Sequence, residues 1–468
     1  MTIRTTVTAA VLSVMAAVAS AQLGAQATTA PATGATFSKD VAPIFFKNCT
    51  NCHRPGEIAP MSLLTFKDAR PWAKSIATQV SKGTMPPWHA DPSHGQFLND
   101  RRLSQAEKDT IVAWANAGAP EGNPSDLPAT PTYASEWLMG KPDAVFSMGE
   151  DYPIPAEGTI AYQYFEVPTT FTEDKWIQAM EVRAGNPSVL HHVIVYARTP
   201  APAMPPPAPP AAAPGAPPAP RPAPVFIFDR ATSAIPPGQS GGPPAAEPKP
   251  LGPNDRPAPA RMGPSIGGFA PGQFIRVYQE GTAMKLPAGA TLVLQSHYTA
   301  NGKPTTDRTR IGVKFASAKP QTEVRFGALI NGTFVIPAGA ADQRVDSEMT
   351  IGQDVTIWSM LPHTHVRGTR WTYEATFPDG RKETILAVPK YDFNWQTDYV
   401  FKQPLKLPKG TKIHATAWYD NSKNNKSNPD PTKDVTWGDQ TWEEMMYTGM
   451  TFSIDAPPTS TTAGPRQN

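Results

Sequence analysis

The sequence has very little cysteine and no hydrophobic run long enough to cross a bilayer. Its 468 residues include two cysteines, Cys49 and Cys52. This excludes disulfides elsewhere in the chain, a blue-copper site with its cysteine thiolate, and cysteine-ligated zinc or iron–sulfur clusters. A spanning helix needs about 20 apolar residues. No stretch beyond the N-terminus approaches this, so we expect no stable membrane insertion.

An excess of charge of one sign is also lacking, because the formal net charge is +2 at pH 7. The basic residues are scattered and form no stripe, so the sequence predicts no nucleic-acid partner. The chain is too long for one ordinary domain and predicts about three units.

The N-terminus has the pattern of an export signal. Arg4 is followed by an apolar, alanine-rich stretch from Val7 to Val18 and by the small-residue site Ala19-Ser20-Ala21. The apolar run is too short to be a comfortable membrane anchor. We therefore predict a signal peptide over residues 1–21 and a periplasmic or secreted mature protein.

Residues 36–122 have helical periodicity and predict a small all-α domain. Ser38 is the predicted cap of a first segment, and Ser104 with Glu107 forms a capping box before a third. The second segment is predicted to place five residues on one face, namely Ala69, Trp72, Ala73, Ile76 and Val80.

After a predicted linker over residues 123–144, the pattern changes to short strands separated by turn residues. Apolar residues alternate at Tyr391, Phe393 and Trp395, and again from Ile413 to Tyr419. Such a run predicts antiparallel β-sandwiches.

One stretch interrupts the strands. Residues 201–262 contain 21 prolines and predict an extended, mobile insertion within a domain. A disordered tail is predicted over residues 456–468.

The sequence Cys49-Thr50-Asn51-Cys52-His53 has the C-x-x-C-H spacing of a covalent haem c attachment site. The two sulfurs of such a site form thioethers with the haem vinyl groups, and the histidine binds iron. A redox dithiol normally lies in an α/β context and a zinc site needs a second ligand pair, neither of which is visible. We therefore predict one haem c, with His53 as an axial ligand.

The second axial ligand is predicted to be Met85, because the prolines that follow it can hold the loop against the haem face. This stretch resembles the methionine loop of class I cytochromes c. Met61, His89 and His94 remain alternatives.

Five of the nine histidines and one methionine form a second group, namely His191, His192, His297, His363, His365 and Met445. Residues two apart in a strand project to one face about 6.5 Å apart, so His363 and His365 can bind one ion. Adjacent residues point to opposite faces, so His191 and His192 can share a metal only where the backbone bulges or ends. A thioether favours cuprous copper, and two imidazoles with one thioether leave positions open for dioxygen.

Four motifs carry a resemblance to a known family: His191-His192-Val193, Leu294-Gln295-Ser296-His297-Tyr298, His363-Thr364-His365 and Glu443-Glu444-Met445. Their order and approximate spacing resemble the copper type II, ascorbate-dependent monooxygenases, the family of dopamine beta-monooxygenase and peptidylglycine alpha-hydroxylating monooxygenase. The resemblance covers about residues 145–455.

By this resemblance, the copper bound by His191, His192 and His297 transfers electrons, and the copper bound by His363, His365 and Met445 binds oxygen and substrate. It implies two jelly-roll-like antiparallel sandwich domains, over 145–310 and 311–455, that face a solvent-filled cleft. Met446 and Met450 remain rival sulfur ligands.

The sequence therefore predicts a haem- and copper-dependent monooxygenase that hydroxylates a C–H bond of a small organic substrate with dioxygen. Its predicted electron source is an external donor, either a soluble redox protein or a small reductant, acting through the fused haem. The alternatives are a non-catalytic electron-transfer or redox-sensing protein and a copper-storage protein.

Overall fold

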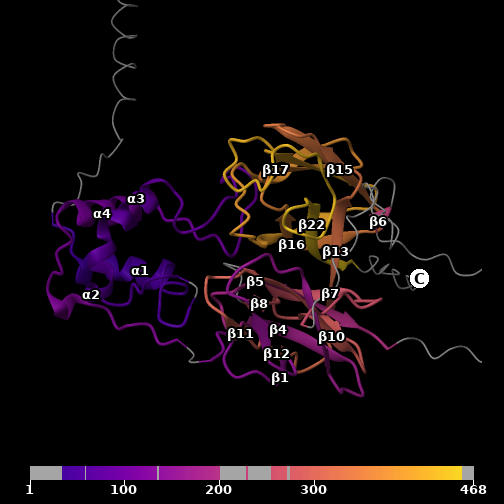
Figure 1. The fold of residues 1–468 in the computed structure, drawn as a ribbon, viewed down its shortest axis with the longest axis horizontal. Helices are drawn as coiled ribbons and strands as arrows, with labels where there is room; N and C mark the ends of the chain where they lie inside the picture. The colour runs from indigo at the N-terminus through magenta and orange to yellow at the C-terminus, as the bar shows by residue number, and fades with distance from the viewer. Residues whose placement is uncertain are drawn as a thin grey trace, which may run out of the picture.

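The computed structural model describes residues 34–57, 59–133, 136–200, 228–229, 254–270 and 275–455. The predicted signal peptide, the predicted tail and most of the proline-rich insertion lie outside the described residues. Short N-terminal helices are followed by several largely antiparallel β-sheets (Figure 1). Within these ranges, none of the helices has both the length and the apolar character to span a membrane.

The helical region consists of η1 (Phe37–Val41), α1 (Ala42–Asn48), α2 (Phe66–Ala69), η2 (Arg70–Trp72), α3 (Ala73–Ser81), α4 (Gln105–Asn116) and η3 (Pro124–Asp126). The predicted capping box is confirmed, because Ser104 and Glu107 exchange both hydrogen bonds at the start of α4. The prediction for Ser38 is wrong: it lies inside η1, whose N-cap is Thr36. The prediction for Trp72 is also wrong, because it lies in the 3₁₀ turn η2, which shifts the helical phase and leaves it 44% exposed.

A nine-stranded sheet runs through the β region. Its strands are, in order, β1 (Ala144–Ser147), β12 (Arg310–Phe315), β4 (Lys175–Arg183), β9 (Thr282–Leu286), β13 (Thr322–Asn331), β22 (Met446–Ile454), β16 (Val355–His363) and β19 (Tyr399–Leu407), with β8 (Ile275–Val277) pairing with β4. Strand β13 pairs in parallel with β9, and this joint links the two halves of the sheet.

Smaller sheets cover the two halves. The four-stranded sheet is β3 (Gln163–Pro168), β10 (Thr291–Tyr298), β5 (Leu190–Arg198) and β7 (Ser265–Phe269). The five-stranded sheet is β18 (Lys382–Val388), β17 (Gly368–Thr376), β20 (Lys412–Tyr419), β15 (Gln343–Ile351) and β6 (Phe228–Asp229). The remaining pairs are β11 (Thr305–Asp307) with β2 (Tyr152–Ile154), and β14 (Val335–Ile336) with β21 (Val435–Thr436).

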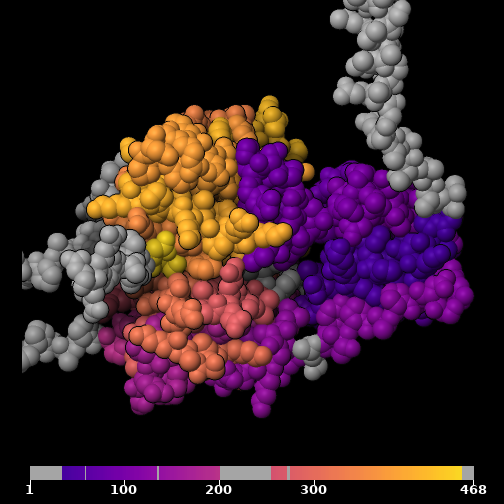
Figure 2. Space-filling view, turned by 180° about the vertical axis from the view of Figure 1, so that it is seen from behind, coloured from indigo at the N-terminus to yellow at the C-terminus, as the bar shows by residue number. Residues whose placement is uncertain are grey.

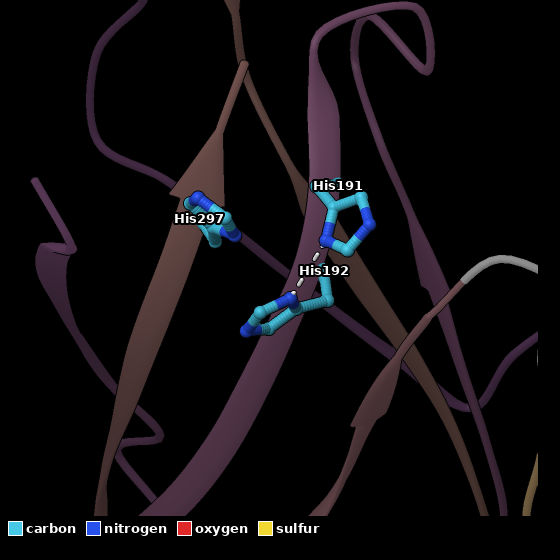
Figure 3. A group of neighbouring side chains, drawn as sticks. All are labelled: His191, His192 and His297. Atoms are coloured by element: carbon cyan, nitrogen blue, oxygen red, sulfur yellow. Dashed lines mark hydrogen bonds between the residues drawn. The ribbon is translucent and has the colours of Figure 1, made fainter. Parts of the chain in front are cut away.

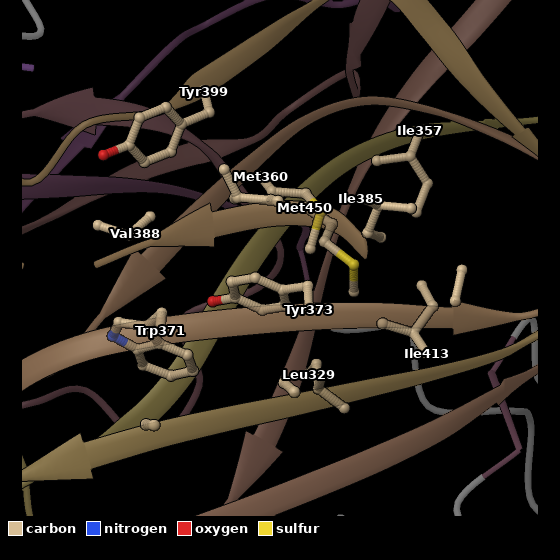
Figure 4. Close-up of a cluster of buried hydrophobic side chains, with 14 of the residues drawn as sticks. Leu329, Ile357, Met360, Trp371, Tyr373, Ile385, Val388, Tyr399, Ile413 and Met450 are labelled. Atoms are coloured by element: carbon tan, nitrogen blue, oxygen red, sulfur yellow. The ribbon is translucent and has the colours of Figure 1, made fainter. Parts of the chain in front are cut away.

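Each half of the β region has its own hydrophobic core. The first core lies between the β1–β9 half of the long sheet and the four-stranded sheet. The second lies between the β13–β19 half and the five-stranded sheet, and Figure 4 shows Trp371, Tyr373 and Met450 within it. Burial on one face only explains the alternating sequence pattern of these strands.

The helical region is joined to the second core. Trp88, Ala90 and Phe97 are buried among the side chains of that core. The backbone around residue 97 also runs beside β19, where Leu98 N donates to Val400 O at 2.8 Å. In Figure 2 a violet N-terminal segment accordingly lies against the orange C-terminal region.

The two strand predictions had different outcomes. The strand from Ile413 to Tyr419 is confirmed as β20, with its predicted apolar face buried. The segment 391–395 is not a strand but a loop before β19, so that prediction is wrong. Its side chains are used by other segments: the Tyr391 hydroxyl, for example, donates to Thr364 O at 2.9 Å.

Candidate metal centre

Strands β5 and β10 bring three histidines together. His297 on β10 lies directly opposite His192 on β5, but the next pair is Tyr298 with Leu190. The register therefore shifts by one residue, and His191 is the extra residue of a β-bulge. This bulge is the backbone irregularity that the adjacent histidines required, and it places both imidazoles beside His297 (Figure 3).

The three imidazoles are close enough to hold one metal ion. One ligand atom from each histidine can be chosen such that all three lie within 4.8 Å of one another. The Nδ1 atoms of His191 and His192 are 3.0 Å apart. Imidazole nitrogens bind first-row metals at about 2.0–2.1 Å, so neighbouring ligands on one ion are about 3 Å apart. The observed spacing fits such a pair.

Two nitrogens of this triad are buried without a hydrogen-bond partner, His191 Nε2 and His297 Nδ1. A buried polar atom without a partner costs about 1–3 kcal/mol. His297 Nδ1 is therefore available to a ligand that the polypeptide does not itself provide, and His191 can offer either this Nε2 or the Nδ1 beside His192, but not both, to one ion.

Burial also sets the protonation state of the triad. It lowers the pKa of His191 to about 4 and, together with the neighbouring imidazoles His191 and His363, lowers the pKa of His297 to about 3. Burial and nearby imidazoles lower the pKa of His192 well below its ordinary value. All three rings are neutral at neutral pH and carry the lone pair that a metal ligand needs.

Polar side chains that sequence reasoning missed surround the triad. The Tyr162 hydroxyl lies 3.0 Å from His192 Nε2, and Thr441 Oγ1 lies 3.2 Å from His297 Nε2. Such partners orient imidazole ligands and fix their tautomers. Gln295, two residues before His297 on β10, bonds to the hydroxyls of Tyr164 and Tyr196.

His363 ends strand β16, and His365 lies two residues beyond, with their ring centroids 5.2 Å apart. His363 Nδ1 lies 2.9 Å from Gln396 Oε1, and His365 Nδ1 lies 3.0 Å from Glu443 O. Both oxygens can only accept, so both Nδ1 atoms carry a proton and both Nε2 atoms carry a lone pair. His365 Nε2 is buried and has no partner.

Glu444 ties Met445 to this second pair. Its buried carboxylate accepts from His365 N and Arg367 N, each at 2.7 Å, and from Met445 N at 3.3 Å. Burial raises the pKa of Glu444 to about 7, against the opposing effect of these backbone N–H groups. The segment that contains Met445 is therefore held next to His365.

The rival methionines lie elsewhere. Met446 and Met450 are 1% and 0% exposed within the second hydrophobic core. Met445 is only partly buried and does not belong to that core. Met445 directly precedes strand β22, in which the ring centroid of Tyr447 lies 6.1 Å from that of His363.

The two histidine groups adjoin each other. The ring centroids of His192 and His363 are 6.4 Å apart. Phe393 contacts both groups: its ring stacks on His191 with centroids 4.8 Å apart and lies 6.1 Å from the ring of His365. Nothing in the local sequence indicated this role, since Phe393 was assigned to a strand face.

A cavity of about 1290 Å³ adjoins the C-x-x-C-H motif. Cys49, Cys52 and His53 line it, as do Met61 and Met85. His89 faces a separate cavity of about 280 Å³ instead. Met85, the predicted ligand, and Met61, an alternative, therefore both line this cavity, whereas His89 does not.

Burial favours the neutral thiol form of both cysteines in the motif. Burial raises the pKa of the Cys49 thiol to about 12 and also raises the pKa of Cys52. The thiolates that disulfide exchange and zinc binding require are therefore disfavoured. His53 Nδ1 lies 3.2 Å from Met61 O, so it carries a proton and leaves Nε2 with the lone pair.

No protein-family model matches the chain, and no curated protein sequence matches it. The mostly β architecture, the neighbouring cysteines and the buried histidine triad therefore stand without a family assignment.

Proposed function

We propose that this chain is an exported copper monooxygenase that hydroxylates a C–H bond of a small organic substrate with dioxygen, and that its electrons arrive through a covalently attached c-type haem. The observation that carries the proposal is the gathering of five largely buried, neutral imidazoles, three of which, His191, His297 and His365, have a buried nitrogen without a partner. They come from segments more than 170 residues apart, between His191 and His365.

The donor set supports copper. His191, His192 and His297 would hold one ion, and His363, His365 and Met445 a second. Imidazole suits several transition metals, whereas a thioether beside two imidazoles favours cuprous copper. Copper held by these residues would supply electron transfer and dioxygen activation, which protein side chains alone do not provide.

The residues around the ligands support the same assignment. Gln396 Oε1 and Glu443 O fix His363 and His365 in the tautomer that exposes Nε2. Glu444 accepts from the backbone N–H groups of His365, Arg367 and Met445 and so holds these two segments together. Acceptors of this kind limit ligand movement and raise imidazole basicity.

The cavity beside Cys49 supports haem. Leu98 and Val277 line it and are 56% and 62% exposed, so an apolar group in the cavity would cover them. Thioether formation removes the acidic S–H groups, so burial of Cys49 and Cys52 carries no ionisation cost. His53 Nε2 would bind the iron, and either Met85, our predicted second ligand, or Met61 is available on the cavity wall.

The proposal is tested by metal analysis and labelling. Purified protein with its covalent haem is loaded with copper, reduced, and supplied with ¹⁸O₂ and a panel of small organic substrates. We expect two coppers and one haem per chain and a product with one labelled oxygen atom. His297→Ala should lose copper and product formation, whereas His414→Ala, a histidine bonded to Asp346 on the other sheet, should lose neither.

Each alternative has its own outcome. Copper binding with reversible reduction and no labelled product across the panel would favour an electron-transfer or sensing protein. Copper that binds but does not undergo redox turnover would indicate storage. Absence of copper from the wild-type protein after loading would refute the proposal.

A further inference from the structure

The large cavity connects the C-x-x-C-H motif to the histidine cluster. Its wall contains Cys49, Cys52 and His53, and it also contains His191. Of the six predicted copper ligands, His191 alone lines this cavity. The other two members of its triad are screened from the cavity. His191 therefore borders the same space as the C-x-x-C-H motif.

A single loop borders both the cavity and the cluster. Asn394 and Trp395 line the cavity. The preceding residue, Phe393, stacks on His191 at an interplanar angle of 23°, and the following residue, Gln396, contacts His363. Four consecutive residues thus reach the cavity wall and both histidine groups.

Hydrogen bonds within this loop and contacts at its end fix its conformation. Gln396 Nε2 donates to Phe393 O at 3.3 Å, and Trp395 N donates to Asp392 O at 3.0 Å. At its end, the buried Asp398 pairs with Arg276 at 2.7 Å, and Asp398 O accepts from Asn99 of the helical region at 2.7 Å. Residues of the helical region and of both halves of the β region therefore fix the position of this loop.

We propose that His191, Phe393 and Trp395 form the contact through which electrons pass from the cavity to the histidine cluster. This inference rests on the proposed function. Haem attached at Cys49 and Cys52 would supply one electron, and copper held by His191, His192 and His297 would accept it, with no proton or further reactant. An external one-electron donor would replace the electron that the haem gives up.

Packing supports this route. Electron tunnelling weakens steeply across gaps that atoms do not fill, so a path through contacting side chains is favoured. The near-parallel stack of Phe393 on His191, with centroids 4.8 Å apart, is a contact without a gap. Trp395, two residues after Phe393, lines the cavity wall.

The test uses the full chain with haem and copper bound. A photochemically generated flavin semiquinone reduces the haem rapidly, and the α-band then reports its reoxidation as the electron moves to cupric copper. We expect Trp395→Leu and Phe393→Leu to slow this intramolecular phase by about tenfold or more, which corresponds to about 1.4 kcal/mol on the barrier. Phe393→Tyr should retain the wild-type rate, because it keeps the aromatic stack.

Matched controls separate this effect from general loss of aromatic packing. Trp418→Leu and Phe171→Leu remove partly buried rings that do not line the cavity, and both should leave the rate unchanged. Copper content and the haem midpoint potential are measured for every variant. If Phe393→Leu lowers copper content, Trp395→Leu is the deciding variant, because Trp395 lines the cavity and is not a predicted copper ligand.

The two possible failures are distinguishable. An unchanged rate in Trp395→Leu, with wild-type copper content, overturns this inference and leaves the proposed function standing. Absence of any copper-dependent reoxidation phase in the wild-type protein overturns the haem route of the proposed function itself.

Discussion

Without a metal bound at the histidine cluster, the folded protein should be sensitive to acid. Burial lowers the pKa of His191 to about 4, of His297 to about 3 and of His363 to about 4. A histidine in an unfolded chain titrates near pH 6.5. Below that pH the unfolded chain binds protons that the folded chain does not bind, so the free energy of unfolding falls as the pH falls.

The expected magnitude is large. At about pH 5, each of these three histidines costs the folded state roughly 2 kcal/mol relative to about pH 7.5, or about 6 kcal/mol together. Burial raises the pKa of Glu444 to about 7, and its protonation offsets about 2 kcal/mol over the same range. The net loss of about 4 kcal/mol is a large part of the ~5–15 kcal/mol by which domains are stable. His192 and His365, whose pKa values burial also lowers, add to the loss.

Urea unfolding of the metal-free protein, followed by tryptophan fluorescence at a series of pH values, measures this effect. The midpoint should fall steadily from about pH 7 to about pH 5. In His297→Gln the free energy of unfolding should fall by about 2 kcal/mol less over this range, because the variant lacks one of the histidines that burial keeps unprotonated in the folded state. A metal-free protein whose stability is constant over this range, or a variant with the wild-type slope, would show that the imidazoles are not held neutral by burial.

Three further predictions concern single contacts. Gln396→Leu leaves the N–H of its histidine partner without an acceptor, so copper affinity should fall by about 10–100-fold in chelator competition, and unchanged affinity would contradict the orienting role. Arg276→Met leaves the Asp398 carboxylate buried without its cation, so the free energy of unfolding in urea should fall by about 3–5 kcal/mol, and a loss near zero would mean that the pair is solvated. Met85→Ala should abolish the long-wavelength thioether absorption of the oxidised haem protein and Met61→Ala should preserve it, whereas the reverse result would assign Met61 as the axial ligand.

Local patterns predicted the elements whose structure depends on neighbours in the chain. The capping box at Ser104 formed because both partners are three residues apart, within one turn. Strand β20 formed with its predicted inward face because its alternating pattern coincides with burial on one side. The bulge at His191 was anticipated because two adjacent side chains cannot share a face of a regular strand.

The segment 391–395 shows where such reasoning ends. Its alternation of aromatic and polar residues is the same as that of a strand, but Tyr391 and Gln396 bond to the Thr364 backbone and to His363 instead of joining a ladder. Contacts with a segment about 30 residues away decided its conformation. No property of the five residues alone distinguishes the two outcomes.

The sequence by itself determined the kinds of donor this protein can offer: thiols at C-x-x-C-H spacing, imidazoles in pairs, a methionine after two acidic residues, and no other cysteine. Only the tertiary structure decided that the imidazoles meet, with ring centroids of His192 and His363 6.4 Å apart, and that His191 is the one predicted copper ligand that lines the cavity of Cys49. Donor identity is a property of each side chain. The distance between donors depends on strand register, on the parallel pairing of β9 with β13 and on the packing of two separate cores. All three are set by contacts between residues distant in the chain.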